Sequence, residues 1–148
     1  MKIKPINDIE KQGLKKALNK VGFFDSFSKL DFKQIIENFE LREYKSDECI
    51  FKQGTHGDAL FLIYQGSVKV IKKTFYFSEK QIAQLSNGEF FGEMALIKDT
   101  QRTASVYAMK QSLIFTLQSP SIDHLIQANP TFRNELTKLS NKRLGIKV

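Results

Sequence analysis

Residues 90–108 read FFGEMALIKDTQRTASVYA and are the most informative stretch of this chain of 148 residues. Gly92 permits a backbone conformation that other residues resist, and the run 94–97 favours a helix of only about one turn. The first N–H groups of a helical turn have no partner inside it and attract an anion. Because Ala95 is small, a phosphate could approach the backbone closely. The sequence therefore predicts an anion-binding turn.

Arg102 stands at the start of an otherwise small and apolar strand, 103–106. An arginine in that position needs an anionic partner, and a bidentate guanidinium suits a phosphodiester. Glu93 could be the partner in a structural ion pair, or it could hold a ligand hydroxyl while Arg102 holds the phosphate. The residues alone leave both hypotheses open.

Outward from this stretch, short runs of β-branched and aromatic residues begin at Leu41 and are broken by turn residues. Apolar alternation on both sides of Gly66 indicates two strands or one bent strand within 59–73. This spacing is typical of a compact sandwich or barrel rather than βαβ units. Further strands are predicted at Gln81–Leu85, Thr103–Ala108 and Leu113–Leu117.

Helices are predicted on both sides of the strands. Apolar residues at helical spacing predict one helix over about residues 9–20, and a capping-box spacing at Ser28 predicts a second over about 29–39. A capping residue precedes a proline at Ser119-Pro120 and Asn129-Pro130, which predicts helices over roughly 120–128 and 131–146.

Composition and charge bound the class of protein. With 41% hydrophobic and 26% charged residues, the composition excludes disorder, collagen and a disulfide scaffold. The longest apolar run, Ala59–Tyr64, has six residues, whereas a membrane span needs roughly 20. The N-terminus lacks a secretory h-region, and the single cysteine, Cys49, fits a reducing compartment, so we expect a cytoplasmic protein.

The net charge of +7 lies at the ends of the chain, since residues 1–20 and 130–148 carry +4 each and the residues between them sum to −1. Neither end shows a recognition helix or an aromatic stacking platform, so we do not expect direct DNA binding. Solvated helix faces and contact with a partner or an anionic surface both fit this pattern.

Known catalytic and metal-binding signatures do not occur in the sequence. It has no Gly-x-x-x-x-Gly-Lys-Ser/Thr loop, no Gly-x-Ser-x-Gly elbow and no His-Glu-x-x-His motif. The two histidines, His56 and His124, form no metal-ligand pair, and Cys49 is predicted to be buried and inert. We therefore expect neither an enzyme nor a resident metal or cofactor.

Phe-Gly-Glu-Met-Ala-Leu at 91–96, followed by Arg-Thr-Ala-Ser-Val-x-Ala at 102–108, resembles the phosphate-binding cassette of cyclic-nucleotide-binding domains. This family includes protein kinase regulatory subunits, the catabolite activator protein and gated channels. The chain departs from many members at Gln101, where they have proline, so the loop is expected to be less rigid.

The resemblance extends outward from the cassette and covers about residues 25–130. It includes Ile50–Gly54 with Gly57-Asp58, then Leu60–Ile63 and Gly66–Val70, in the order and spacing of the family's strands.

The resemblance implies a single domain that is mainly β, an eight-stranded jelly-roll β-barrel flanked by helices. The N-terminal helices would occupy 1–40, the barrel 41–118 with its cassette at 91–105, and two C-terminal helices 119–148. The ligand would be cAMP or cGMP, held between the cassette and the barrel wall.

The resemblance also implies roles for individual residues. Backbone N–H groups around Gly92 and Ala95, with the Arg102 side chain, would cradle the cyclic phosphate, and Glu93 would bind the ribose 2′-hydroxyl. Thr103 would add a hydroxyl to the phosphate or the base, and Val70, Ile82 and Leu85 match the apolar purine wall, although plain core packing explains them equally well. The predicted ligand-binding set is Phe91, Gly92, Glu93, Met94, Ala95, Arg102, Thr103, Ala104, Val70, Ile82 and Leu85.

The C-terminal helix is the predicted moving part, because helices after the barrel swing toward the occupied pocket in relatives. Arg143 and Leu144 are candidates for covering the base, and a fixed, solvated tail is the alternative. Thr103 permits cGMP without requiring it, and Glu135 is the one acid in 130–148, so we favour cAMP.

Four functions fit the resemblance to different degrees. The favoured one is a cyclic-nucleotide sensor in signal transduction that regulates a separate protein effector. A scaffold that has the fold but binds no nucleotide is the alternative. The two histidines of this chain are far apart in the sequence, which disfavours a cupin-like metalloenzyme. The segment after Asn129 is short, which disfavours a transcription regulator.

Overall fold

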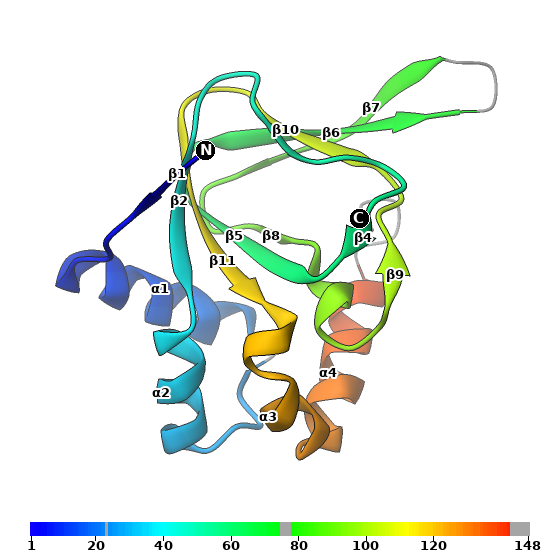
Figure 1. The fold of residues 1–148 in the computed structure, drawn as a ribbon. Coiled ribbons are helices and arrows are strands. Elements are labelled where there is room, and N and C mark those ends of the chain that lie inside the picture. The colour runs from blue at the N-terminus through cyan, green and yellow to red at the C-terminus, as the bar shows by residue number, and fades with distance from the viewer. Residues whose placement is uncertain (23, 75–77, 143–148) are drawn as a thin grey trace.

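The computed structural model describes residues 1–22, 24–74 and 78–142 (Figure 1). The helices are α1 (Asp8–Val21), α2 (Lys29–Glu37), α3 (Asp123–Gln127) and α4 (Pro130–Asn141), with short 3₁₀ turns η1 (Glu93–Leu96) and η2 (Ser119–Ser121). The strands are β1 (Lys2–Lys4), β2 (Glu40–Tyr44), β3 (Cys49–Phe51), β4 (His56–Gly57), β5 (Ala59–Gln65), β6 (Ser67–Lys73), β7 (Glu79–Ser86), β8 (Phe90–Phe91), β9 (Thr100–Gln101), β10 (Ser105–Ala108) and β11 (Ser112–Gln118).

Capping residues fix the helix ends close to the predicted positions. The side chain of Ser28 accepts a hydrogen bond from the Asp31 N–H, and that of Asn129 accepts one from the Phe132 N–H. Ser119-Pro120 begins only the 3₁₀ turn η2, and the regular helix α3 starts at Asp123. The helix α4 ends at Asn141. The last helix was predicted to extend to residue 146, and the part of that prediction beyond residue 142 lies outside the described residues.

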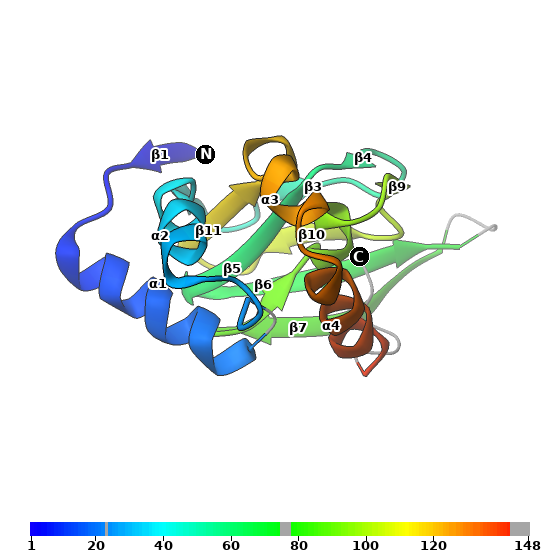
Figure 2. The same cartoon turned by 90° about the horizontal axis from the view of Figure 1, so that it is seen from below.

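The strands form three antiparallel sheets within the described residues. The first has the order β1-β2-β11-β5-β8, the second β3-β10-β6-β7, and the third pairs β4 with β9. The β6–β7 hairpin extends past the other strands, and all of the labelled helices lie on one side of the molecule (Figures 1 and 2).

The prediction of one eight-stranded barrel was wrong in its strand count and in its closure. The described residues contain eleven strands in three separate sheets. Several strands have only two or three residues, too short to show an alternating pattern, and a single residue, Asp58, separates β4 from β5. At Gly66 the structure has the first of the two predicted arrangements: a one-residue bend separates two strands, β5 and β6, which belong to different sheets.

Strand β5, which lies between β11 and β8, separates two cores in the interior. Its residues 59, 61 and 63 belong to an apolar cluster between the two large sheets, whereas Leu60 and Leu62 belong to a second cluster shared with the helices. Alternate residues of a strand point to opposite faces, so a strand buried on both faces must be apolar throughout. This explains the uninterrupted run Ala59–Tyr64.

Three phenylalanines anchor α4 in the helical core. The Phe132 ring is fully buried and stacks on Phe24 with a centroid distance of 5.3 Å and an interplanar angle of 20°. Phe27 packs on the same ring at 5.0 Å. The buried face of α4 is therefore in contact with the segment between α1 and α2. In the described part of the chain, no helix is both long and apolar enough to cross a membrane.

We expect Gly66→Ala to lower the free energy of unfolding by about 3 kcal/mol or more. Gly66 has a φ of +126°, and a Cβ there would lie 2.5 Å from the Cβ and 2.8 Å from the Cα of Ser112. Gly88→Ala is the matched control, because Gly88 also has a positive φ of +84° but an added Cβ meets nothing within 4 Å. It should cost only about 1 kcal/mol of backbone strain. Urea unfolding followed by circular dichroism measures both, and equal losses would contradict the steric argument.

Candidate functional site

The cassette begins with a glycine turn between β8 and η1. Gly92 has a φ of +74°, and a Cβ there would lie 2.9 Å from the Ala59 carbonyl oxygen, so the turn requires glycine. It starts the 3₁₀ turn η1, whose residues Glu93 and Ala95 are buried and whose Met94 is half-buried. The predicted turn at 92–95 is thus a single helical turn led by glycine.

The Arg102 side chain reaches back from the end of the cassette and is buried, with 4% of its surface exposed. Its Nη2 donates a hydrogen bond to the Ala59 carbonyl oxygen at 2.9 Å, and Nη1 donates to the Gly92 carbonyl oxygen at 3.4 Å. The structure therefore joins Arg102 to the glycine turn.

Aromatic rings surround the guanidinium. The Cζ atom of Arg102 lies 4.2 Å from the centroid of the Phe51 ring and 5.8 Å from that of Phe61. Phe61 in turn stacks on Phe91, with centroids 5.0 Å apart and an interplanar angle of 9°. A cation over an aromatic face is stabilised by the ring quadrupole, more strongly where water is excluded.

Two carboxylates, those of Asp58 and Glu93, favour the charged form of the guanidinium. Burial lowers the pKa of Arg102 below its usual value, because desolvation disfavours the charged form, while Asp58 and Glu93 both act to raise it. An arginine side chain stays protonated in proteins despite such a shift. The site therefore holds a permanent positive charge in a mostly apolar setting.

Backbone pairing fixes where Arg102 stands. Its N–H donates to the Thr55 carbonyl oxygen, and its own carbonyl oxygen accepts from the Gly54 N–H, both at 2.7 Å. The neighbouring pairs His56 with Gln101 and Gly57 with Thr100 form the β4–β9 sheet. Gln101, where many relatives have proline, is thus held in a strand pair.

The predicted purine-wall residues lie on the hairpin β6–β7. Val70 and Leu85 are buried in the cluster between the sheets, and the half-buried Ile82 packs against that cluster. Ala104 and Phe91 belong to the same cluster, whereas Thr103 is exposed. The structure therefore brings the wall candidates together in the core, which is compatible with both of their predicted roles. Arg143 and Leu144 lie outside the described residues.

Sequence reasoning missed three residues of this site: Phe51, Gly57 and Asp58. A Cβ on Gly57 would lie 2.8 Å from Arg102 Nε, so glycine leaves room for the guanidinium. The available signal was the need of a buried arginine for acids and rings, but local spacing does not reveal which distant residues supply them.

The other polar candidates have separate surroundings. His56 Nδ1 lies 2.9 Å from Asp99 Oδ1, and His124 contacts Gln34. Burial raises the pKa of the half-buried Cys49 thiol, with Lys52 and Tyr107 acting in the opposite direction. Among the residues that the structure describes, no group of three or more His, Cys, Asp or Glu side chains is arranged to hold a metal ion.

Residues 41–129 match the family described as "Cyclic nucleotide-binding domain". The cGMP-dependent protein kinase, isozyme 1, of Drosophila melanogaster is 37% identical over 90% of this chain, and the cAMP-dependent protein kinase regulatory subunit of Mycosarcoma maydis is 37% identical over 63%. The chain spans only 18% of the length of each of these two relatives.

A solved structure, that of a cyclic nucleotide-binding domain from Methylobacillus flagellatus, is similar to nearly the whole chain. It superposes with a TM-score of 0.79 at 25% identity, and the match covers 96% of this chain and 82% of that one. The similarity therefore includes the flanking helices as well as the strands.

Proposed function

The chain belongs to the cyclic nucleotide-binding domain family, and on this premise we propose that it binds a cyclic nucleotide at its cassette, 91–105, as a regulatory module without catalysis of its own. This is the family that residues 90–108 predicted. The observation that carries the proposal is the buried guanidinium of Arg102, which is hydrogen-bonded to the carbonyl oxygen of the glycine that starts η1.

The cyclic phosphate would lie between the start of η1 and Arg102. Backbone N–H groups around Gly92 and Ala95 would donate to the phosphate oxygens, and the guanidinium would supply the charge. A buried, permanently charged group interacts more strongly with an anion than an exposed one, because water screens it less. Thr103, at the exposed edge of the same segment, would add a hydroxyl.

Glu93 and the hairpin would bind the rest of the nucleotide. Glu93 would accept a hydrogen bond from the ribose 2′-hydroxyl, and Val70, Ile82 and Leu85 would offer apolar contact to the purine. Glu93 was predicted either to form an ion pair with Arg102 or to contact the ligand. Its charge acts on Arg102, and this effect is compatible with both hypotheses. One carboxylate can balance the arginine and bind a hydroxyl.

The change caused by ligand binding would be passed on to a separate effector protein in the cytoplasm. The relatives include a protein kinase and a protein kinase regulatory subunit, so a phosphorylation enzyme is one class of effector. Cys49, a lone thiol, is compatible with the reducing environment of that compartment.

Calorimetric titration of nucleotide-free protein tests the function and ranks the ligands. We expect cAMP to bind at least as tightly as cGMP, because the single acid of 130–148, Glu135, offers little to pair with guanine. Noncyclic AMP should bind far more weakly. A cGMP affinity more than about tenfold above that for cAMP would reverse the preference, and the absence of heat with all three would favour the scaffold alternative.

Arg102→Ala should weaken cyclic-nucleotide binding at least about tenfold, because a charge-assisted contact to a desolvated phosphate contributes about 1.5–3 kcal/mol. Arg42→Ala is the matched control, since Arg42 carries the same charge on β2 and pairs with Glu40 instead. Circular dichroism verifies that both variants fold. If the affinity of Arg102→Ala equals that of the control, the ligand is bound elsewhere.

We further propose that α4 relays ligand binding. η1 contacts α4, and the α4 residues Phe132 and Leu136 are fully buried in the helical core. Saturation with cAMP should change amide hydrogen exchange in α4 about threefold or more, because the ligand must favour one docking of this helix. Exchange in β11 serves as the internal control. A response confined to α1 would assign the relay to the N-terminal helices.

A further inference from the structure

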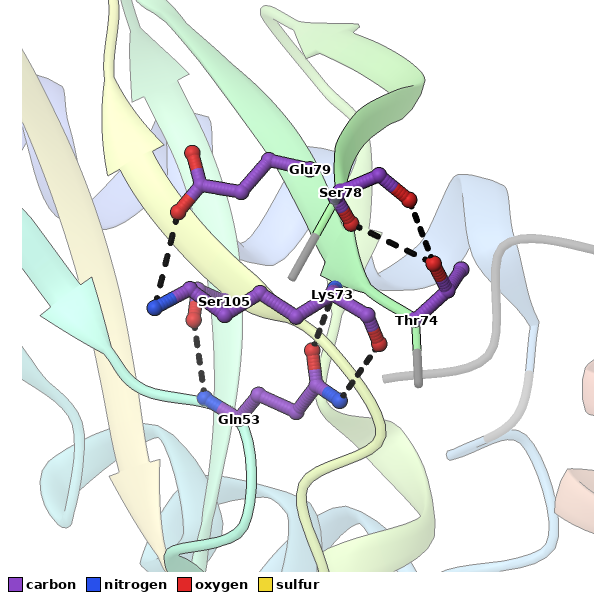
Figure 3. A network of polar contacts seen from close by, with 6 residues as sticks. All are labelled: Gln53, Lys73, Thr74, Ser78, Glu79 and Ser105. Atoms are coloured by element: carbon purple, nitrogen blue, oxygen red, sulfur yellow. Dashed lines mark hydrogen bonds and ion pairs between the residues drawn. The ribbon is translucent and has the colours of Figure 1, made fainter. Parts of the chain in front are cut away.

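The side chain of Gln53 joins two parts of the fold. Gln53 follows β3, and its amide makes two hydrogen bonds with the backbone of Lys73 at the end of β6 (Figure 3). Nε2 donates to the Lys73 carbonyl oxygen at 3.2 Å, and the Lys73 N–H donates to Oε1 at 2.8 Å. A neighbouring strand makes the same two opposed bonds to one residue in an antiparallel sheet.

This amide takes the place of a strand residue beyond the end of β10. The β10–β6 ladder stops where Ser105 pairs with Ile71, two residues before Lys73. Every second residue of an antiparallel strand directs its N–H and C=O toward the same neighbour, so Lys73 presents them on the side of Ile71 that faces β10. Gln53 satisfies both groups and extends the sheet by one rung.

The backbone near Gln53 is bonded to the cassette. The Gln53 N–H donates to Ser105 Oγ at 2.9 Å. The two following residues, Gly54 and Thr55, exchange backbone hydrogen bonds with Arg102 at 2.7 Å. One short segment, 53–55, therefore contacts the phosphate-binding arginine, the first residue of β10 and the end of β6.

The end of the hairpin is braced internally, so it can move as a unit. The Lys73 Nζ atom lies 3.5 Å from Glu79 Oε1, and Thr74 Oγ1 donates to the Ser78 carbonyl oxygen at 3.4 Å (Figure 3). The Thr74 N–H donates to the same carbonyl oxygen at 3.0 Å. These contacts hold β6 against β7. Gln53 is the side chain that ties this pair to the segment carrying Arg102.

We infer that Gln53 is a positioning residue that sets the separation between the phosphate subsite at Arg102 and the purine wall on β6 and β7. The inference rests on the proposed function. Val70 lies three residues before Lys73 on β6, and Ile82 lies three residues after Glu79 on β7, so both wall residues belong to the two strands whose ends Gln53 and the Lys73–Glu79 pair hold. Without that rung the hairpin end is free to shift, while Arg102 keeps its bonds to Gly54 and Thr55.

The inference predicts that variants of Gln53 lose affinity for a cyclic nucleotide only when the ligand carries a base. Gln53→Ala and the shorter amide Gln53→Asn should each weaken cAMP binding about fivefold, the scale of one or two neutral hydrogen bonds. Binding of 1-deoxyribose 3′,5′-cyclic phosphate, which lacks a base, should change less than about twofold, because it needs only the phosphate and ribose contacts. Gln84→Ala, an exposed glutamine of β7, is the control and should bind both ligands as the wild type does.

Hydrogen exchange gives a second readout that needs no ligand. The Lys73 amide donates to Gln53 Oε1, so its exchange should become about tenfold faster in Gln53→Ala and stay unchanged in Gln84→Ala.

Three results would overturn the inference. The first is an equal loss of affinity for cAMP and the base-free ligand in the Gln53 variants, which would mean a general structural role. The second is unchanged cAMP affinity, and the third is an unchanged Lys73 exchange rate. Each of these with normal wild-type binding overturns this inference alone, whereas a wild-type protein that binds no cyclic nucleotide overturns the proposed function and this inference together.

Discussion

The burial of one positive charge constrains how this fold is assembled. Removing a guanidinium from water costs several kcal/mol unless hydrogen bonds and opposite charges replace the water. For Arg102 those replacements come from three segments: the Phe51 ring of β3, the Asp58 carboxylate with the adjacent Ala59 carbonyl oxygen, and the Gly92 carbonyl oxygen with the Glu93 carboxylate of the cassette. Ala59 is 43 residues from Arg102 in the sequence, whereas Gly92 is only 10 residues away, so the arginine is favourable only when near and distant segments have come together.

The same arrangement explains why two glycines stand beside the arginine. At Gly57 and at Gly92 an added Cβ would lie within 3 Å of the guanidinium, so any larger residue would displace it. At Gly92 the positive φ also directs the chain from β8 into η1. The glycines are thus needed both for space and for backbone direction. A site built in this way is organised before any anion arrives, and little reordering opposes binding.

Local signals in the sequence were enough to identify the family and to choose the candidate site. A glycine before a one-turn helical run and an arginine in an apolar strand can each be recognised from a few adjacent residues. The family was identified from these two signals. Phe51 and Asp58 were missed because their role exists only through contacts across the fold. The strand count failed for a related reason: strands such as β8 and β9 have two residues and owe their pairing to their surroundings, so no apolar period marks them. Longer elements with their own caps, such as α1 and α4, were predicted within a few residues where the structure describes them.

The two cores meet at the cassette, so the proposed ligand site is packed against the helical core as well as the sheets. Phe91, at its start, belongs to the cluster between the sheets, whereas Leu96, at the end of η1, belongs to the helical cluster that also holds Phe132 and Leu136. Cores are packed at nearly crystalline density, so a residue in one of them cannot shift without a response from its neighbours. A ligand that repositions η1 must therefore change the packing of Leu96 in the core that α4 shares. Arg102, held by backbone bonds to Gly54 and Thr55, stays with the sheets. The cassette thus has one end fixed to the strands and the other packed among the helices, which is the geometry that a relay from phosphate to helix requires.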